Sequence, residues 1–146
     1  MKTLSEDSKY YIPKHRYLEL KHFCLQYNDW NEETLVLLKE VPSNLMYEAH
    51  HFNRGIGYTP SDPTFQKALR LAEIDAKIDL IRKACKETDE DLHTYLLIGV
   101  TSDKNYEFLN HVLRMPCSRG TYYDRYRKFF YILDKMQRNL ALTIPN

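Results

Sequence analysis

The chain has 146 residues, of which 43% are hydrophobic and 28% charged, and its net charge is +1 at pH 7. These values fit one globular domain that can bury a real core. They exclude an acidic DNA mimic and a polybasic tail, so only the distribution of charge along the chain carries information about partners.

The cysteines and the first residues indicate where the protein resides. Cys24, Cys85 and Cys117 are odd in number and far apart, which favours free thiols in a reducing compartment over a disulfide framework. The polar start MKTLSEDSKYY lacks the apolar core of a signal peptide. No apolar run approaches the ~18 residues of a membrane helix. We therefore expect a cytoplasmic protein without a membrane span.

Helical periodicity dominates and glycine is scarce, so the expected fold is all-α. Residues 1–41 are predicted to form an N-terminal helical hairpin. Its first helix begins near Pro13 and carries an apolar stripe of residues three and four apart, namely Tyr17, Leu20, Cys24 and Tyr27. Asn28-Asp29 interrupts the stripe, and Asn31 is a suitable N-cap for the second helix.

Residues 42–61 hold two of the four glycines and two prolines, which predicts a loop or linker. The remaining residues, 62–146, are expected to form a long central helix followed by a helix-turn-helix. Asp62-Pro63 is a good start for the long helix, which should run to about Lys86. It carries two apolar stripes, one from Leu71 to Cys85 and one from Phe65 to Ala76. Two stripes imply contacts on two sides, either with the rest of the chain or with a second copy.

Two shorter helices are expected next. Residues 88–91, Thr-Asp-Glu-Asp, resemble a capping box, so a helix should run from 89 to about 98 and end at Gly99. Ser102 can cap the following helix over 103–114.

The last helix is expected to begin after the turn Met115-Pro116-Cys117, with Ser118 as its cap, and to end near Leu140. Between residues 119 and 138 six Arg or Lys and two Asp give a net charge of +4, which leaves −3 for the rest of the chain. Helical spacing gathers an apolar face that should enter the core: Tyr122, Tyr126, Phe129, Leu133 and Met136. The opposite face holds Asp124, Arg127, Lys128, Tyr131 and Lys135. This segregation favours a surface that faces a polyanion.

A short helix, a tight turn and a Ser-capped helix with basic first turns are typical of a helix-turn-helix, whose second helix enters the DNA major groove. Arg119 and Tyr123, one turn apart, are the predicted base readers. Gly120 would let the backbone approach DNA closely. The predicted DNA-binding residues are Ser118, Arg119, Gly120, Tyr123, Asp124, Arg125, Arg127 and Lys128. The competing interpretation is a solvated basic face, and the helix dipole alone favours Lys135 and Arg138 near the C-terminal end.

Other chemistries find little support in the sequence. The six histidines lack the spacing of a zinc site, and the acidic residues 89–91 suit the N-terminus of a helix better than a pair of catalytic acids. Cys117, near Arg119 at a helix start, is a candidate for a lowered thiol pKa, but a nucleophile would also need a positioned histidine. We expect no catalytic residue, no metal and no cofactor.

Three segments carry a resemblance to a known family: LELKHFCLQYNDW (18–30), ALRLAEIDAKIDLIRKA (68–84) and SRGTYYDRYRKFF (118–130). In this layout the chain resembles the RinA/ArpU-type transcriptional regulators of phages and mobile elements in Gram-positive bacteria. Relative to that pattern, Gly120 is an insertion at the start of the last helix. The resemblance implies a C-terminal helix-turn-helix like the promoter-reading region of sigma factors. It also implies a regulator of phage gene expression that works with host RNA polymerase.

The leading hypothesis is a non-enzymatic, sequence-specific regulator that binds double-stranded DNA. A homodimer is expected, because one helix-turn-helix buries little DNA surface and binds weakly alone. The alternative is a phage-encoded protein-binding module whose basic helix contacts RNA polymerase or inhibits a host defence enzyme. A third hypothesis is an RNA-binding protein in which Tyr123 and Tyr131 stack on bases.

Overall fold

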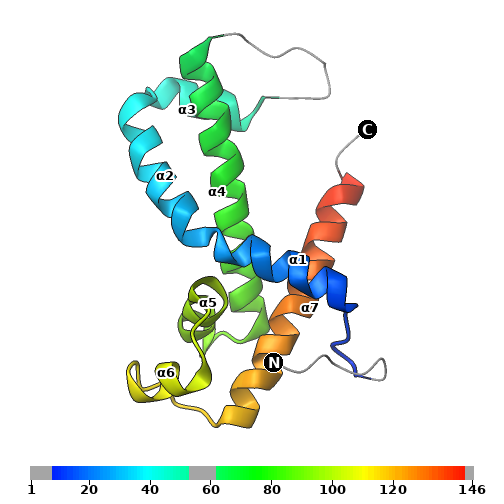
Figure 1. Ribbon diagram of the computed structural model, residues 1–146. Coiled ribbons are helices and arrows are strands. Elements are labelled where there is room, and N and C mark those ends of the chain that lie inside the picture. The colour runs from blue at the N-terminus through cyan, green and yellow to red at the C-terminus, as the bar shows by residue number, and fades with distance from the viewer. Residues whose placement is uncertain (1–7, 53–61, 144–146) are drawn as a thin grey trace.

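The computed structural model describes residues 8–52 and 62–143, and across these ranges the chain folds into helices joined by short turns, without a strand (Figure 1). The predicted all-α class is confirmed. Seven helices follow one another in the described ranges: α1 (Lys14–Leu25), α2 (Tyr27–Glu40), α3 (Ser43–His50), α4 (Pro63–Thr88), α5 (His93–Ser102), α6 (Tyr106–His111) and α7 (Arg119–Thr143).

Helices α1 and α2 do not pair as the expected hairpin. Only Gln26 separates them, and its φ of −83° and ψ of −8° continue the right-handed helical path, so the chain bends where a hairpin would need a reversal. Helix α1 crosses α5 and α7, whereas α2 runs along α4 (Figure 1). Helix α2 also begins before the predicted cap Asn31, with Asp29 in its first turn, where a negative charge favours the helix dipole.

The predicted loop over 42–61 is helical in its first part. Pro42 precedes α3, which packs on the first turns of α4. The contact is a small apolar cluster separate from the main core, with Val41, Ala49, Phe65, Ala68 and Leu69 buried in it. The rest of the predicted linker, residues 53–61, lies outside the described part of the chain.

Helix α4 corresponds to the predicted long helix and packs against α2, α3, α5 and α7. The side chain of Asp62 caps it by accepting a hydrogen bond of 3.0 Å from the Thr64 N–H. Its two predicted stripes face two different clusters. Ile74, Ile78 and Ile81 enter the main core, and Phe65 meets α3. The second stripe is short, because Ala76 is already exposed to solvent.

The prediction that a helix ends at Gly99 is wrong. Helix α5 passes through Gly99 to Ser102, and the chain then turns at Asp103, whose φ is 53°. A Cβ atom at Gly99 would collide with the Tyr122 hydroxyl, so the glycine allows α7 to pack closely on α5. Asn105, not Ser102, caps α6, since its side-chain oxygen accepts a 3.0 Å hydrogen bond from the Phe108 N–H.

Helix α7 packs along the C-terminal half of α4, and α1 crosses over it (Figure 1). The expected apolar face is confirmed: Tyr122, Tyr126, Phe129 and Leu133 are buried, and Met136 is half-buried. Across residues 8–52 and 62–143, none of the helices combines the length and the hydropathy that a membrane crossing demands.

Candidate nucleic-acid interface

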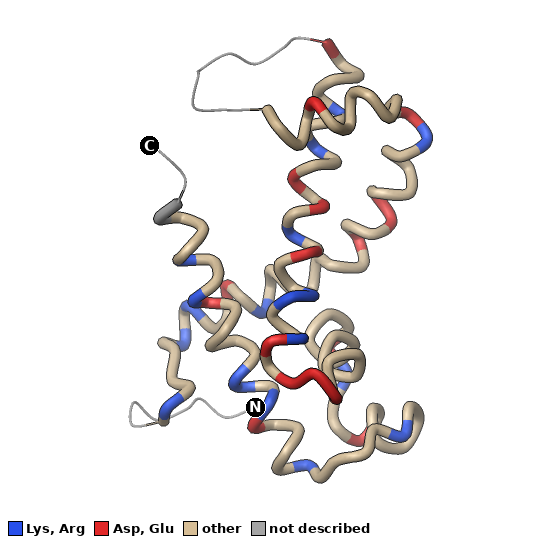
Figure 2. Tube along the Cα trace, turned by 180° about the vertical axis from the view of Figure 1, so that it is seen from behind, with Lys and Arg blue, Asp and Glu red and all other residues tan. Residues whose placement is uncertain are grey.

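The charge segregation inferred from the sequence is visible along the backbone trace. Figure 2 shows basic residues recurring along α7, while acidic residues gather at the turn between α4 and α5, beside the first half of α7. The candidate interface is therefore the unit formed by α6, the turn 112–118 and the first turns of α7, which we call the α6–α7 unit.

The turn of this unit is held by specific contacts. Arg114 adopts a left-handed conformation with a φ of 57°, and the buried Met115 donates its N–H to the Leu109 carbonyl at 3.0 Å. The Tyr106 hydroxyl, on α6, donates a 2.7 Å hydrogen bond to the Cys117 carbonyl. These contacts fix the start of α7 relative to α6.

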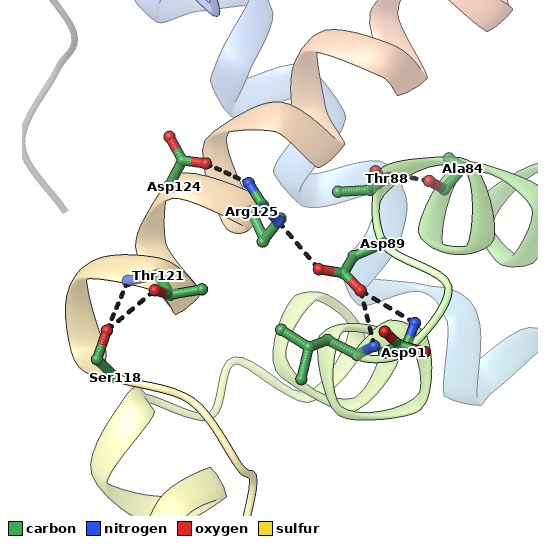
Figure 3. A network of polar contacts seen from close by, with 9 residues as sticks. Ala84, Thr88, Asp89, Asp91, Ser118, Thr121, Asp124 and Arg125 are labelled. Carbon is green, nitrogen blue, oxygen red and sulfur yellow. Dashed lines mark hydrogen bonds and ion pairs between the residues drawn. The ribbon is translucent and has the colours of Figure 1, made fainter.

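The first turn of α7 is capped as predicted and open to solvent. The Ser118 hydroxyl accepts a hydrogen bond of 3.2 Å from the Thr121 N–H and donates one of 3.0 Å to the Thr121 Oγ1 (Figure 3). Residues 118–121 are all exposed. A Cβ atom at Gly120 would have no neighbour within 4 Å, so packing within the described chain does not require a glycine there.

The two predicted base readers face α6. The Arg119 guanidinium forms an ion pair with Glu107 of α6 and lies 5.2 Å from the centre of the Tyr123 ring. The Tyr123 hydroxyl accepts a long, 3.5 Å hydrogen bond from the Tyr106 N–H. The Arg119 and Glu107 side chains are 62% and 49% exposed, so their ion pair is weak and can exchange with another anion.

Arg125 and Asp124 are occupied within the protein. Arg125 Nε lies 2.9 Å from Asp89 Oδ2, and its Nη1 lies 2.6 Å from Asp124 Oδ2 (Figure 3). The other oxygen of Asp89 accepts hydrogen bonds of 3.0 Å from the N–H groups of Asp91 and Leu92. Arg125 thus ties α7 to the turn before α5, a role that differs from the predicted phosphate contact.

The same contacts set the charge of Asp89. Burial raises the pKa of the Asp89 carboxyl. The hydrogen bonds from Arg125, Leu92 and Asp91 together lower it by more than burial raises it, so the pKa lies below the ordinary value. Asp89 therefore stays ionised and holds Arg125 in place. The predicted capping-box threonine does not cap α5, since the Thr88 hydroxyl donates to the Ala84 carbonyl at 2.7 Å.

Arg127 and Lys128 lie on the outward face of α7, as predicted, and are half-buried. Within the described ranges, neither forms an ion pair with a carboxylate. Further along the same face, Lys135 lies 4.3 Å from the centre of the Tyr131 ring, and Arg138 pairs with Asp134 at 3.1 Å. In the described ranges, the basic residues of α7 without a carboxylate partner are therefore Arg127 and Lys128 in the first half of the helix and Lys135 in the second.

Two exposed residues of the α6–α7 unit were missed by the sequence analysis. Arg114 sits in the turn, with no carboxylate partner in the part of the chain that the structure describes, and Thr121 projects from the first turn of α7. A basic residue in the turn of a helix-turn-helix pattern was the available signal for Arg114. Thr121 was not predicted, because the base contacts of this turn were assigned to Arg119, two residues earlier.

Cys117 does not have the lowered thiol pKa that its position suggests. Burial and the nearby Asp89 raise the pKa, and Arg125 lowers it less. Burial likewise raises the pKa of Cys85 to about 12. Among the described residues, no group of three or more His, Cys, Asp or Glu side chains is arranged to hold a metal ion.

Comparison with protein-family models, curated proteins and solved structures gives no match for this chain. The resemblance to RinA/ArpU-type regulators therefore stays a prediction.

Proposed function

We propose that this protein is a sequence-specific transcriptional regulator of a phage or mobile element. It would bind double-stranded DNA with the α6–α7 unit. One observation carries the proposal. The capped first turn of α7 is exposed, and it leads into Arg127 and Lys128, which have no carboxylate partner among the described residues.

The first turn suits an approaching phosphate. Ser118 satisfies the N–H of Thr121, and within the described residues the N–H groups of Arg119 and Gly120 have no acceptor. Gly120 has no side chain to block access to them. The positive end of the helix dipole adds to the attraction for an anion.

Base contacts then fall to Thr121 and Arg119. An exposed ion pair such as Arg119–Glu107 contributes about 0–1 kcal/mol. A bidentate contact between arginine and guanine contributes about 1–3 kcal/mol of discrimination. Exchange of Glu107 for a guanine edge is therefore favourable, and Glu107 holds the guanidinium ready in the free protein.

The backbone contacts fall to cations without an internal partner. Arg114, Arg127 and Lys128 can neutralise about three phosphates, which predicts a slope of log K against log salt of about −2.7 for duplex DNA. Arg125 is not among them, because Asp89 and Asp124 already neutralise it.

Selection of bound duplexes from a random-sequence pool, followed by fluorescence anisotropy of the selected site, tests the proposal. Lys128→Ala should weaken binding to all duplexes about equally, and Arg119→Ala should reduce discrimination between sites. Lys67→Ala is the matched control, because Lys67 pairs with Glu40 at 2.9 Å in the distant contact between α2 and α4.

Enrichment of no motif, with equal affinities for Lys128→Ala and Lys67→Ala, would reject the proposal. In that case the basic face would be left for an acidic protein surface, which is the alternative hypothesis. Tighter binding to single-stranded RNA than to any duplex would favour the third.

A further inference from the structure

Helix α2 has a second apolar surface on the side opposite its core contacts. Tyr27, Trp30 and Leu37 are buried against the rest of the protein. On the other side, four exposed residues follow the helical spacing of three and four, so they share one face: Glu32, Leu35, Val36 and Lys39. Leu35 is 64% exposed and Val36 57% exposed. We call these four residues the outer face of α2.

The charged residues at the two ends of this face have no partner within the described chain. Their neighbours do: Glu33 accepts a hydrogen bond of 2.7 Å from Arg70, and Glu40 lies 2.9 Å from Lys67. Across residues 8–52 and 62–143, Glu32 and Lys39 form no ion pair. The outer face thus has an acidic end, an apolar centre and a basic end.

This pattern is complementary to itself when it is reversed. Positions 32 and 39 lie symmetrically about the midpoint between Leu35 and Val36. A two-fold axis at that midpoint sets two α2 helices antiparallel and places Glu32 opposite the partner subunit's Lys39. The same axis sets Leu35 against the partner's Val36, and each contact occurs twice.

We propose that the outer face of α2 is the contact surface of a homodimer, with the two α2 helices antiparallel about this axis. A second copy of the chain is the occupant that the charges select, because it supplies a lysine for the acidic end and a glutamate for the basic end. The face is accessible, since α2 lies at the edge of the molecule (Figure 1). The proposal does not depend on DNA binding.

The dimer is weak. The outer face spans about 10 Å of helix at 1.5 Å per residue, and one helix pair of this length buries less than the about 1,200 Å² of a stable interface. The surface is also remote from the N-terminal end of α7 (Figure 1), so dimerisation leaves the α6–α7 unit uncovered.

Sedimentation equilibrium over about 1 μM to 1 mM protein covers the dissociation constants expected of such an interface. Wild type should show a reversible monomer–dimer equilibrium. Leu35→Glu should raise the dissociation constant by about tenfold or more, because the dimer then buries two unpaired carboxylates. The matched control is Val112→Glu, at another exposed apolar residue, 61% exposed, which should dimerise like wild type.

Charge reversals test the antiparallel register. Glu32→Lys and Lys39→Glu should each weaken dimerisation, and the double variant should recover it, because the reversed pairs again have opposite charges. A mixture of the two single variants should form a heterodimer more tightly than either variant forms a homodimer. All of these residues are exposed, so unfolding temperatures should stay close to wild type.

A wild-type protein that stays monomeric across the concentration series overturns the proposal. A dimer that Leu35→Glu and Val112→Glu leave equally intact overturns it as well, since the contact then lies elsewhere. Failure of the double variant to recover dimerisation rejects the antiparallel register. Failure of DNA binding would affect none of these measurements.

Discussion

Replacement of Arg125 by methionine separates the role that the structure gives this residue from the phosphate contact predicted by the sequence. The change removes the guanidinium that bonds Asp89 at 2.9 Å and Asp124 at 2.6 Å, and it keeps most of the side-chain length. The Arg125 and Asp89 side chains are 34% and 18% exposed, between a surface pair and a buried one.

The magnitude follows from that intermediate exposure. Exposed ion pairs contribute about 0–1 kcal/mol, and hydrogen bonds to charged groups about 1.5–3 kcal/mol. We expect Arg125→Met to lower the free energy of unfolding by about 1–2 kcal/mol, which corresponds to a fall in Tm of about 3–8 °C for a domain of this size.

Circular dichroism during thermal and urea unfolding measures the loss. Arg127→Met is the control, because Arg127 lies on the same helix without a carboxylate partner in the described ranges, and it should change stability by less than about 0.5 kcal/mol. A double-mutant cycle with Asp89→Asn should give a coupling energy of about 1 kcal/mol. Equal stability of the two methionine variants refutes the reasoning. A variant Arg125→Met that keeps wild-type stability but loses DNA affinity would refute it as well, because Arg125 would then contact DNA and not hold α7 in place.

The same contact predicts a dependence on pH. Although burial raises the pKa of Asp89, hydrogen bonds from Arg125 and two backbone N–H groups bring it below the ordinary value. A lowered folded-state pKa contributes stability that is fully present above the unfolded-state pKa of about 3.9 and is lost as pH falls through the folded-state value. The stability gap between wild type and Asp89→Asn should therefore shrink below about pH 4. An equally large gap at about pH 3 and pH 7 would contradict this assignment.

Gly99→Ala should destabilise the protein by about 1–3 kcal/mol, because the added methyl group collides with the Tyr122 hydroxyl. That hydroxyl is buried without a partner in the described residues, so Tyr122→Phe alone should change the free energy of unfolding little. Combined with Gly99→Ala, it should restore part of the lost stability in urea unfolding. If it restores none, the clash lies elsewhere. Ser118→Ala should cost about 0.5–2 kcal/mol through loss of the α7 cap, measured by the same unfolding curves, and a neutral result would show that the cap is unimportant. Gly120→Ala should stabilise α7 by about 0.5–1 kcal/mol, because open space surrounds the position. If the backbone approaches a phosphate there, the same change should weaken duplex binding measured by anisotropy. A gain in stability without a change in affinity would place the phosphate contact elsewhere.

Local signals predicted the fold where the interactions are local. The caps Asp62 and Ser118 both accept hydrogen bonds from N–H groups two or three residues away, and the apolar spacing of α7 named its buried face correctly. The same kind of reasoning failed at Gly99. A glycine ends many helices, but here it was needed for contact with Tyr122, which is distant in the sequence.

The first two helices show the same limit. Periodicity found both helices, but it carried no information on whether they fold back on each other. That outcome depends on the conformation of Gln26 and on the larger apolar surface that α4 offers to α2. The helix over Ser43–His50 was not predicted, because the prolines and glycines of 42–61 indicated a loop over the whole stretch.

The amino-acid sequence alone indicated that the chain is helical, that the last long helix begins directly after its cap Ser118, and which face of that helix is apolar. These properties depend on hydrogen bonds and side-chain spacings within about one helical turn. Which cations of that helix have a carboxylate partner depends on the tertiary structure. Arg119 is paired with a carboxylate 12 residues away and Arg125 with one 36 residues away, whereas Arg127 and Lys128 have no such partner in the described chain. Pairing over such separations depends on how whole helices pack, and a pattern of three and four residues does not contain that information.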